Sequence, residues 1–223
     1  MENNKNENLN EQQQHWENTF TSNPEMFGDK PSKAAVHALN IFKKTGATQI
    51  LELGAGQGRD TLFFAQNGLH VYVLDYTREG TTTIRQKAAS YGLNKYVTVI
   101  QHDVRETFPL SDDIFDGCFS HLLYCMAFTT SQLHKLNQEV RRILRPGGFN
   151  IYTVRHTGDS HYGKGIYHDE DMYEVGGFIV HFFCENKVKK LSDGYRIVTV
   201  DELEEGGLPR KLFQVTLEKY TND

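Results

Sequence analysis

The chain is poor in cysteine, and its few cysteines form no recognisable framework. Only Cys118, Cys125 and Cys184 occur among 223 residues, and no two of them have the C-x-x-C spacing of a metal or redox motif. An odd number of scattered thiols argues against a disulfide-stabilised secreted domain and fits the reducing cytoplasm. We therefore expect free core cysteines in a cytoplasmic protein.

Long apolar runs and clustered positive charge are also missing. No segment approaches the roughly 20 apolar residues that cross a bilayer, and the polar N-terminus lacks the apolar stretch of a secretory signal. Lys and Arg number 24 against 29 Asp and Glu, and they are scattered instead of forming a basic stripe. These absences argue against a membrane partner and against nucleic acid as a substrate.

Length and local composition predict a single domain. A chain of 223 residues buries roughly 70% of its unfolded surface as one unit, so no second domain is needed. Residues 1–14 are mostly Asn, Gln and Glu, which offer too little apolar surface to offset the entropy of ordering and predict a disordered tail. The domain then covers residues 15–223, as a monomer or homodimer. The aromatic segment 15–31 predicts either a lid over a ligand or a brace on the core.

The most informative segment, residues 49–59, is an apolar strand followed by alternating glycines. Gly54, Gly56 and Gly58 let the backbone turn sharply, so a ligand can lie against the main chain where a strand ends and a helix begins. The pattern G-x-G-x-G differs from the G-x-G-x-x-G that holds a pyrophosphate. It therefore disfavours a nicotinamide-dependent oxidoreductase.

Acidic residues end the next two apolar runs. Asp75 follows Gly54 by 21 positions, the spacing at which an acidic residue accepts hydrogen bonds from both hydroxyls of a bound ribose. Asp103 ends a third run and is positioned to accept from an adenine amino group. The sequence thus predicts a nucleotide-like cofactor at one edge of a sheet.

Apolar strands alternate with helical patterns along most of the chain. This alternation gives right-handed crossovers and a parallel sheet covered by helices on both faces, with ligands at the carboxyl ends of the strands. The predicted helices cover residues 32–44, 59–67, 78–91 and 131–144. The predicted strands cover residues 49–53, 69–74, 96–100, 114–120 and 149–154, with a closing pair at 195–201 and 211–219.

Taken in order, these motifs resemble the class I S-adenosylmethionine-dependent methyltransferases. The matching segments are LELGAGQGRD at 51–60, VLDY at 73–76, QHDV at 101–104, FDGCFSHL at 115–122 and LRPGGF at 144–149. The resemblance implies an α/β fold, a Rossmann-like three-layer sandwich. Its mostly parallel seven-stranded sheet would have the order 3-2-1-4-5-7-6, with the last strand antiparallel. A weaker resemblance, in residues 182–195 and 211–215, is to the tellurite-resistance and thiopurine-type small-molecule methyltransferases.

The resemblance also implies a cofactor and the residues that bind it. S-adenosylmethionine would be the methyl donor and S-adenosylhomocysteine the product. The residues carried over as cofactor-binding are Glu52, Gly54, Ala55, Gly56, Gly58, Arg59, Asp75, Tyr76, Asp103, Val104, Ser120 and His121.

Candidate catalytic residues follow from the chemistry of methyl transfer. An in-line displacement needs alignment and exclusion of water, and it needs a base only when the attacking atom arrives protonated. His121 is the first candidate because imidazole titrates near neutral pH, although a purely structural role is equally open. Tyr124 and His156 are further candidates. The expected function is methylation of a small molecule, and the alternative is a non-catalytic protein that binds or senses the same cofactor.

A polar insert, residues 155–183, follows the fifth predicted strand. Its first nineteen residues contain three histidines, four carboxylates and three tyrosines, which could form a metal site, the wall of a polar pocket or a solvated loop. The spacing matches no zinc pattern. We therefore expect no metal and a polar pocket wall, covered by the apolar segment 178–183.

Overall fold

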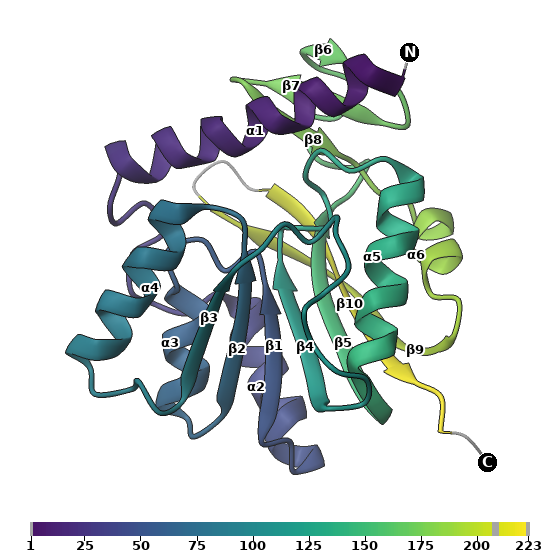
Figure 1. The fold of residues 1–223 in the computed structure, drawn as a ribbon. Helices are drawn as coiled ribbons and strands as arrows, with labels where there is room; N and C mark the ends of the chain where they lie inside the picture. Colours follow the sequence, from purple (N-terminus) through teal and green to yellow (C-terminus); the bar gives the residue numbers. More distant parts are fainter. Residues whose placement is uncertain (1, 207–209, 222–223) are drawn as a thin grey trace.

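The computed structural model describes residues 2–206 and 210–221. A seven-stranded sheet with the order β3-β2-β1-β4-β5-β10-β9 lies at its centre (Figure 1). The first five strands pair in parallel, whereas β10 is antiparallel to both β5 and β9. The predicted order is confirmed, with β9 and β10 in the places of the sixth and seventh strands. These strands are β1 (Gln49–Leu53), β2 (His70–Asp75), β3 (Val97–Gln101), β4 (Phe115–His121), β5 (Leu144–Arg155), β9 (Tyr195–Glu205) and β10 (Arg210–Lys219).

Helices cover both faces of this sheet and complete three layers. α2, α3 and α4 share one buried apolar cluster with β1 and β2, and α5 and α6 share another with β4, β5 and β10. The sequence predicted α2 to α5 to within one residue at each end, but it did not predict α6. The helices of the described residues are α1 (Glu2–Ser22), α2 (Lys33–Thr45), α3 (Arg59–Gln66), α4 (Arg78–Ser90), α5 (Thr130–Ile143) and α6 (Glu185–Leu191).

A buried carboxylate links the start of α2 to the start of α3. The Ser32 side chain caps α2 by accepting a hydrogen bond from the Ala35 amide at 2.9 Å. The Ser32 amide and hydroxyl donate in turn to the Asp60 carboxylate, at 2.7 and 2.8 Å. Because Asp60 lies in the first turn of α3, this contact fixes the helix that follows the glycine loop.

The N-terminal segment is helical and attached to the body. α1 crosses above the carboxyl ends of the strands (Figure 1). The Gln12 amide donates to the Gly177 carbonyl and accepts from the Ile179 amide, and Gln13 donates to the Tyr76 carbonyl. The prediction of a disordered tail over residues 1–14 is therefore wrong for this part of α1, because side-chain amides hold it where apolar groups are scarce. Residue 1 lies outside the described residues.

The 155–183 insert forms a second, three-stranded antiparallel sheet. Its strands are β6 (Ile166–Tyr167), β7 (Met172–Val175) and β8 (Phe178–His181). Three successive residues between β6 and β7, residues 169–171, have positive φ, a strained conformation for residues other than glycine. Lys187 of α6 donates to the Glu170 carbonyl at 2.9 Å and to the Asp171 carboxylate at 3.2 Å. The amine thus attaches the insert to the body of the fold.

Candidate active site

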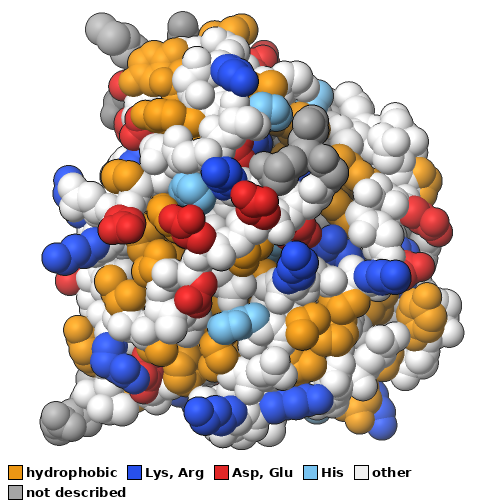
Figure 2. Space-filling view, turned by 180° about the vertical axis from the view of Figure 1, so that it is seen from behind, with side chains coloured by type: hydrophobic (Ala, Val, Ile, Leu, Met, Phe, Trp, Pro, Cys, Tyr) orange, Lys and Arg blue, Asp and Glu red, His pale blue; other side chains and the backbone are white. Residues whose placement is uncertain are grey.

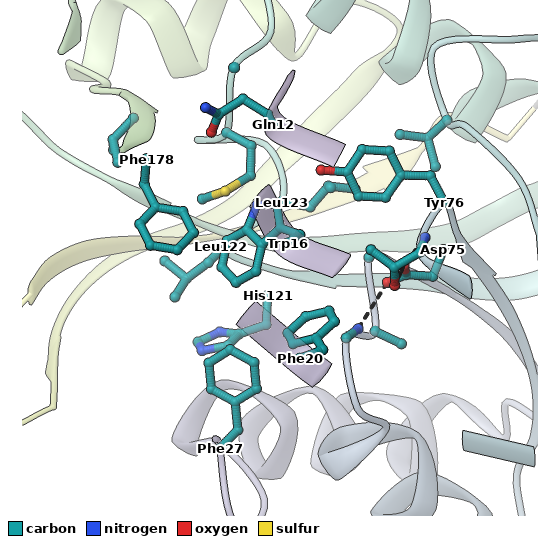
Figure 3. Close-up of a pocket in the computed structure, with 18 of the residues that line it drawn as sticks. Gln12, Trp16, Phe20, Phe27, Asp75, Tyr76, His121, Leu122, Leu123 and Phe178 are labelled. Atoms are coloured by element: carbon teal, nitrogen blue, oxygen red, sulfur yellow. Dashed lines mark hydrogen bonds between the residues drawn. The ribbon is translucent and has the colours of Figure 1, made fainter. Parts of the chain in front are cut away.

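A cavity of about 480 Å³ lies at the carboxyl ends of β1, β2 and β4 (Figure 3). Residues 54–56 of the glycine loop line one side of it. Aromatic side chains from α1 and β8 line another, with the Trp16 ring 5.4 Å from that of Phe20 and 4.7 Å from that of Phe178. This volume is typical of sites for small molecules and cofactors.

The glycine loop has the backbone conformation that the sequence predicted. Gly54, Gly56 and Gly58 all have positive φ, at 64°, 56° and 83°. The Gly56 amide donates to the Asp75 carboxylate at 2.9 Å. Gly58 differs from the other two because it does not line the cavity: a Cβ there would lie 2.7 Å from the Ile84 side chain. Gly58 therefore permits close packing of α4 and lies outside the cavity lining.

Asp75 is buried at the end of β2, beside the loop. Besides the Gly56 amide, its carboxylate accepts from the Thr77 amide at 2.8 Å and from the Thr77 hydroxyl at 2.6 Å. A carboxylate offers about four lone pairs, so these three donors leave room for a ligand hydroxyl. Burial raises the pKa of Asp75 and exceeds the opposing effect of the hydrogen bonds. Tyr76 also lines the cavity, and burial raises the pKa of its phenol, so it is neutral there.

The acidic residue expected to contact adenine is held by an arginine that the sequence analysis did not single out. The Arg105 Nε donates to both Asp103 carboxylate oxygens at 2.9 Å, and the Arg105 amide donates to one of them at 3.0 Å. Burial raises the pKa of Asp103, but the hydrogen bonds from Arg105 outweigh it and the net shift is downward. Val104 and His102 line the same region, and the buried His102 Nε2 has no hydrogen-bond partner among the described residues. An adenine ring, rich in polar edges, fits this environment.

Glu52 is a buried carboxyl that lines the cavity at the end of β1. Burial, reinforced by the nearby Asp60 carboxylate, raises the pKa of Glu52 to about 8. The Thr61 hydroxyl donates to it at 2.5 Å and opposes the shift only in part. Glu52 is therefore mostly protonated at neutral pH in the ligand-free protein.

His121 lies at the end of β4 with both ring nitrogens engaged. The Thr153 hydroxyl oxygen accepts from the Leu122 amide and lies 2.9 Å from His121 Nδ1, so its proton is free to donate to that nitrogen. This assigns the ring proton to Nε2, which lies 3.1 Å from Glu205. Burial raises the pKa of Glu205, but the hydrogen bond from His121 and the charge of Arg59, 3.6 Å away, outweigh it and lower the pKa. The free lone pairs of this pair therefore belong to the carboxylate.

Besides Gly58, three of the predicted site residues lie outside the cavity. Ser120 is fully buried on the opposite side of β4 from its cavity-lining neighbour. Tyr124 is also fully buried, with its ring stacked 4.3 Å from that of Tyr152. His156 stacks on Phe213 at 4.5 Å and accepts a hydrogen bond from a backbone amide. The structure therefore corrects the assignment of Tyr124 and His156 as catalytic and of Ser120 as cofactor-binding. The other predicted residues, Gly58 excepted, line the cavity.

The sequence analysis did not single out several polar and charged residues of the cavity, and four of them gather on the side of β5 and β10. They are Arg155, His161, Glu205 and Arg210. No local spacing marks them, because they meet only when β10 inserts beside β5 and the hairpin of β9 and β10 reaches the glycine loop. For the 155–183 insert, the sequence predicted a polar pocket wall but did not indicate which of its residues would line the cavity.

Two further features concern metals and membranes. Residues 2–206 and 210–221 contain no group of three or more His, Cys, Asp or Glu side chains arranged to hold a metal ion. No helix in that same part of the chain has the length and apolar character needed to cross a bilayer. On the face shown in Figure 2, positive and negative side chains are interspersed.

Comparison with known proteins supports the interpretation of this cavity. Residues 50–148 match the family model described as "Methyltransferase domain". A malonyl-[acyl-carrier protein] O-methyltransferase from Pectobacterium atrosepticum is 27% identical over 124 residues, which are 55% of this chain and 44% of that protein. The chain thus spans less than half the length of this curated relative.

Solved structures show the same fold at low sequence identity. The 1,6-didemethyltoxoflavin-N1-methyltransferase of Burkholderia thailandensis, with bound 1,6-didemethyltoxoflavin and S-adenosylhomocysteine, superposes with a TM-score of 0.75 and 18% identity over 96% of this chain and 90% of that chain. TehB from Haemophilus influenzae superposes with a TM-score of 0.68 and 15% identity over 92% of this chain and 67% of that chain. The sequence match, together with the sheet order and the glycine loop of the structure, identifies residues 50–148 as a methyltransferase domain.

Proposed function

We propose that this protein transfers the methyl group of S-adenosylmethionine to a small-molecule acceptor enclosed beneath α1 and the β7–β8 hairpin. One observation carries the proposal: a single cavity joins the glycine loop to His121, Glu205 and an apolar wall. A site of that shape can align an acceptor with the donor and exclude water, which are the main requirements of in-line displacement.

Different residues of the site would hold different parts of the cofactor. Asp75 would accept from a ribose hydroxyl, and the side chains around Asp103 and Val104 would enclose the adenine. The backbone of residues 54–56 would lie against the remainder, with Arg59 positioned for its carboxylate. Bound there, S-adenosylmethionine supplies an electrophilic methyl group on a sulfonium.

The His121–Glu205 pair would receive a proton from an acceptor that arrives protonated. Thr153 fixes the imidazole, and its Nε2 lies 3.1 Å from the Glu205 carboxylate, so the accepting lone pairs are those of the carboxylate. Glu205 is then the group that contacts the acceptor, and His121 orients it and shares the proton. His121, the first candidate base in the sequence, would thus act as one member of a pair.

The aromatic side chains of α1 would exclude water from the reaction. Trp16 and Phe20 line the cavity, and Glu17 accepts from the Arg78 and Glu79 amides at the start of α4. Glu17 thus holds α1 against the start of α4, the helix that follows β2 and Asp75. Between the two open interpretations of segment 15–31, these contacts support a lid.

The test combines binding with turnover. We would titrate the protein with S-adenosylmethionine by calorimetry, then incubate it with methyl-labelled donor and a metabolite extract and analyse labelled products by mass spectrometry. We expect one donor per chain and a labelled small molecule, with turnover but not donor binding lost in Glu205→Gln. Arg196→Gln, an exposed substitution on β9, is the matched control. Donor binding without any labelled product would favour the non-catalytic alternative, and no donor binding would refute both.

A further inference from the structure

We propose that the methyl acceptor carries a carboxylate, which Arg155 and Arg210 bind at the β5–β10 end of the cavity. This inference rests on the proposed function, because it names the class of acceptor for that same site. The structural features that carry it are a buried, pre-oriented guanidinium, a second guanidinium that forms no ion pair with any described residue, and an apolar wall beside them.

Arg155 is fixed in position but only partly used. Its Nε and Nη2 donate to the fully buried Asp159 carboxylate, and its guanidinium lies 5.2 Å from the centre of the Phe182 ring. Asp159 is itself held by the His161 and Lys211 amides at 2.8 and 2.9 Å. Nη1 has no hydrogen-bond partner among the residues that the structure describes. Because Arg155 lines the cavity, this nitrogen is a pre-organised donor for a ligand oxygen.

Arg210 adds a second positive charge at the same end. It lines the cavity and is the cross-strand partner of Glu205, but no described residue forms an ion pair with it within 4 Å. Leu212, two residues further along β10, pairs with Arg155 of β5. The two guanidiniums therefore project from neighbouring strands at the same edge of the sheet.

Arg210 is the guanidinium of this region that has no carboxylate beside it. Arg59 lies 3.4 Å from Asp60 and 3.6 Å from Glu205, and Arg155 is bound by Asp159, whereas no described residue forms an ion pair with Arg210. An anionic ligand would pair with Arg210 and with the remaining donor of Arg155. Arginine forks bind carboxylates with two parallel hydrogen bonds.

The surrounding wall indicates the rest of the acceptor. Met126, Phe128, Phe178 and Val180 line the cavity and offer no charged groups. Leu122, directly after His121, has a φ of 63°, an uncommon conformation that is retained here against its cost. The acceptor class is thus an apolar, aromatic or aliphatic body that bears one carboxylate.

The experiment uses benzoate and its neutral isostere benzamide as probes. Both would be titrated, up to 20 mM, into protein saturated with S-adenosylhomocysteine, whose binding is measured first by calorimetry. We expect benzoate to bind at least tenfold more tightly than benzamide. Arg210→Gln and Arg155→Lys should each reduce that preference to about twofold while changing the affinity for S-adenosylhomocysteine by less than twofold. Arg196→Gln should retain the full preference.

The outcomes separate the two proposals. Equal or absent binding of benzoate and benzamide, or a preference that survives both variants, would overturn the carboxylate site while leaving methyl transfer intact. A tenfold loss of S-adenosylhomocysteine affinity in either variant would also overturn it, because the arginines would then serve the cofactor. Failure of the wild type to bind S-adenosylhomocysteine would instead refute the proposed function. Arg210 is exposed, so its variant tests the site even if Arg155→Lys fails to fold.

Discussion

Replacing Glu52 with glutamine should make the ligand-free protein less sensitive to alkaline pH. The pKa of Glu52 is raised from its ordinary 4.5 to about 8 by burial and by the Asp60 carboxylate. Between those values the unfolded chain has lost this proton while the folded chain keeps it. The contribution of Glu52 to stability is therefore complete below pH 4.5 and falls as the pH rises toward 8.

The size of the effect follows from the same shift. Each pH unit in that interval removes about 1.4 kcal/mol, so the free energy of unfolding should change by about 3 kcal/mol between pH 5.5 and 7.5 through this group alone. Glu52→Gln keeps an oxygen for the Thr61 hydroxyl and removes the titration. We expect the variant to match the wild type only below pH 4.5, and its stability advantage over the wild type to grow by about that amount between pH 5.5 and pH 7.5.

Urea denaturation at constant ionic strength, at pH 5.5, 6.5 and 7.5, measures this difference. Glu185→Gln, an exposed substitution at the start of α6, is the control and should leave the pH dependence unchanged. Asp75 also has a raised pKa, but it is common to both proteins and cancels in the comparison. Identical pH slopes for wild type and Glu52→Gln would show that Glu52 is ionised in the folded state and would refute the reasoning.

Three further substitutions test separate parts of the site. Gly54→Ala should lower donor affinity at least tenfold by calorimetry, because its φ is 64° and the new Cβ would lie 2.8 Å from Leu123; unchanged affinity would contradict the proposed loop contact. Trp16→Ala should weaken donor binding about tenfold and speed its release in stopped-flow measurements, and an unaltered release rate would argue for a brace instead of a lid. Glu205→Gln should reduce kcat by about 100-fold or more with little change in the KM for the donor. A rise in that KM as large as the fall in kcat would indicate that the His121–Glu205 pair serves binding.

The sequence predicted those features of the site that depend on short spacing. Gly54, Gly56 and Asp75 belong to one β-loop-α-β unit, so a fixed local pattern places them together. His121 was found in the same way, as the residue directly after the fourth predicted strand, which the structure extends to include it.

The residues that were misassigned or missed depend on contacts distant in sequence. Tyr124 and His156 follow strands that end near the cavity, but the direction of a side chain after a strand is set by packing partners such as Tyr152 and Phe213. Glu205 reaches the cavity only through the closing hairpin. The order of the segment around Gln12 could not be predicted from composition. It depends on hydrogen bonds between the Gln12 side-chain amide and backbone groups that are distant in sequence.

The most direct measurement is a crystal structure of the protein with S-adenosylhomocysteine. We expect the adenosyl group in the cavity beside residues 54–56, with a ribose hydroxyl within hydrogen-bond distance of Asp75 and the adenine next to Asp103 and Val104. A ligand bound elsewhere, or a cavity that stays closed by Trp16 and Phe20 at saturating ligand, would contradict this placement of the cofactor.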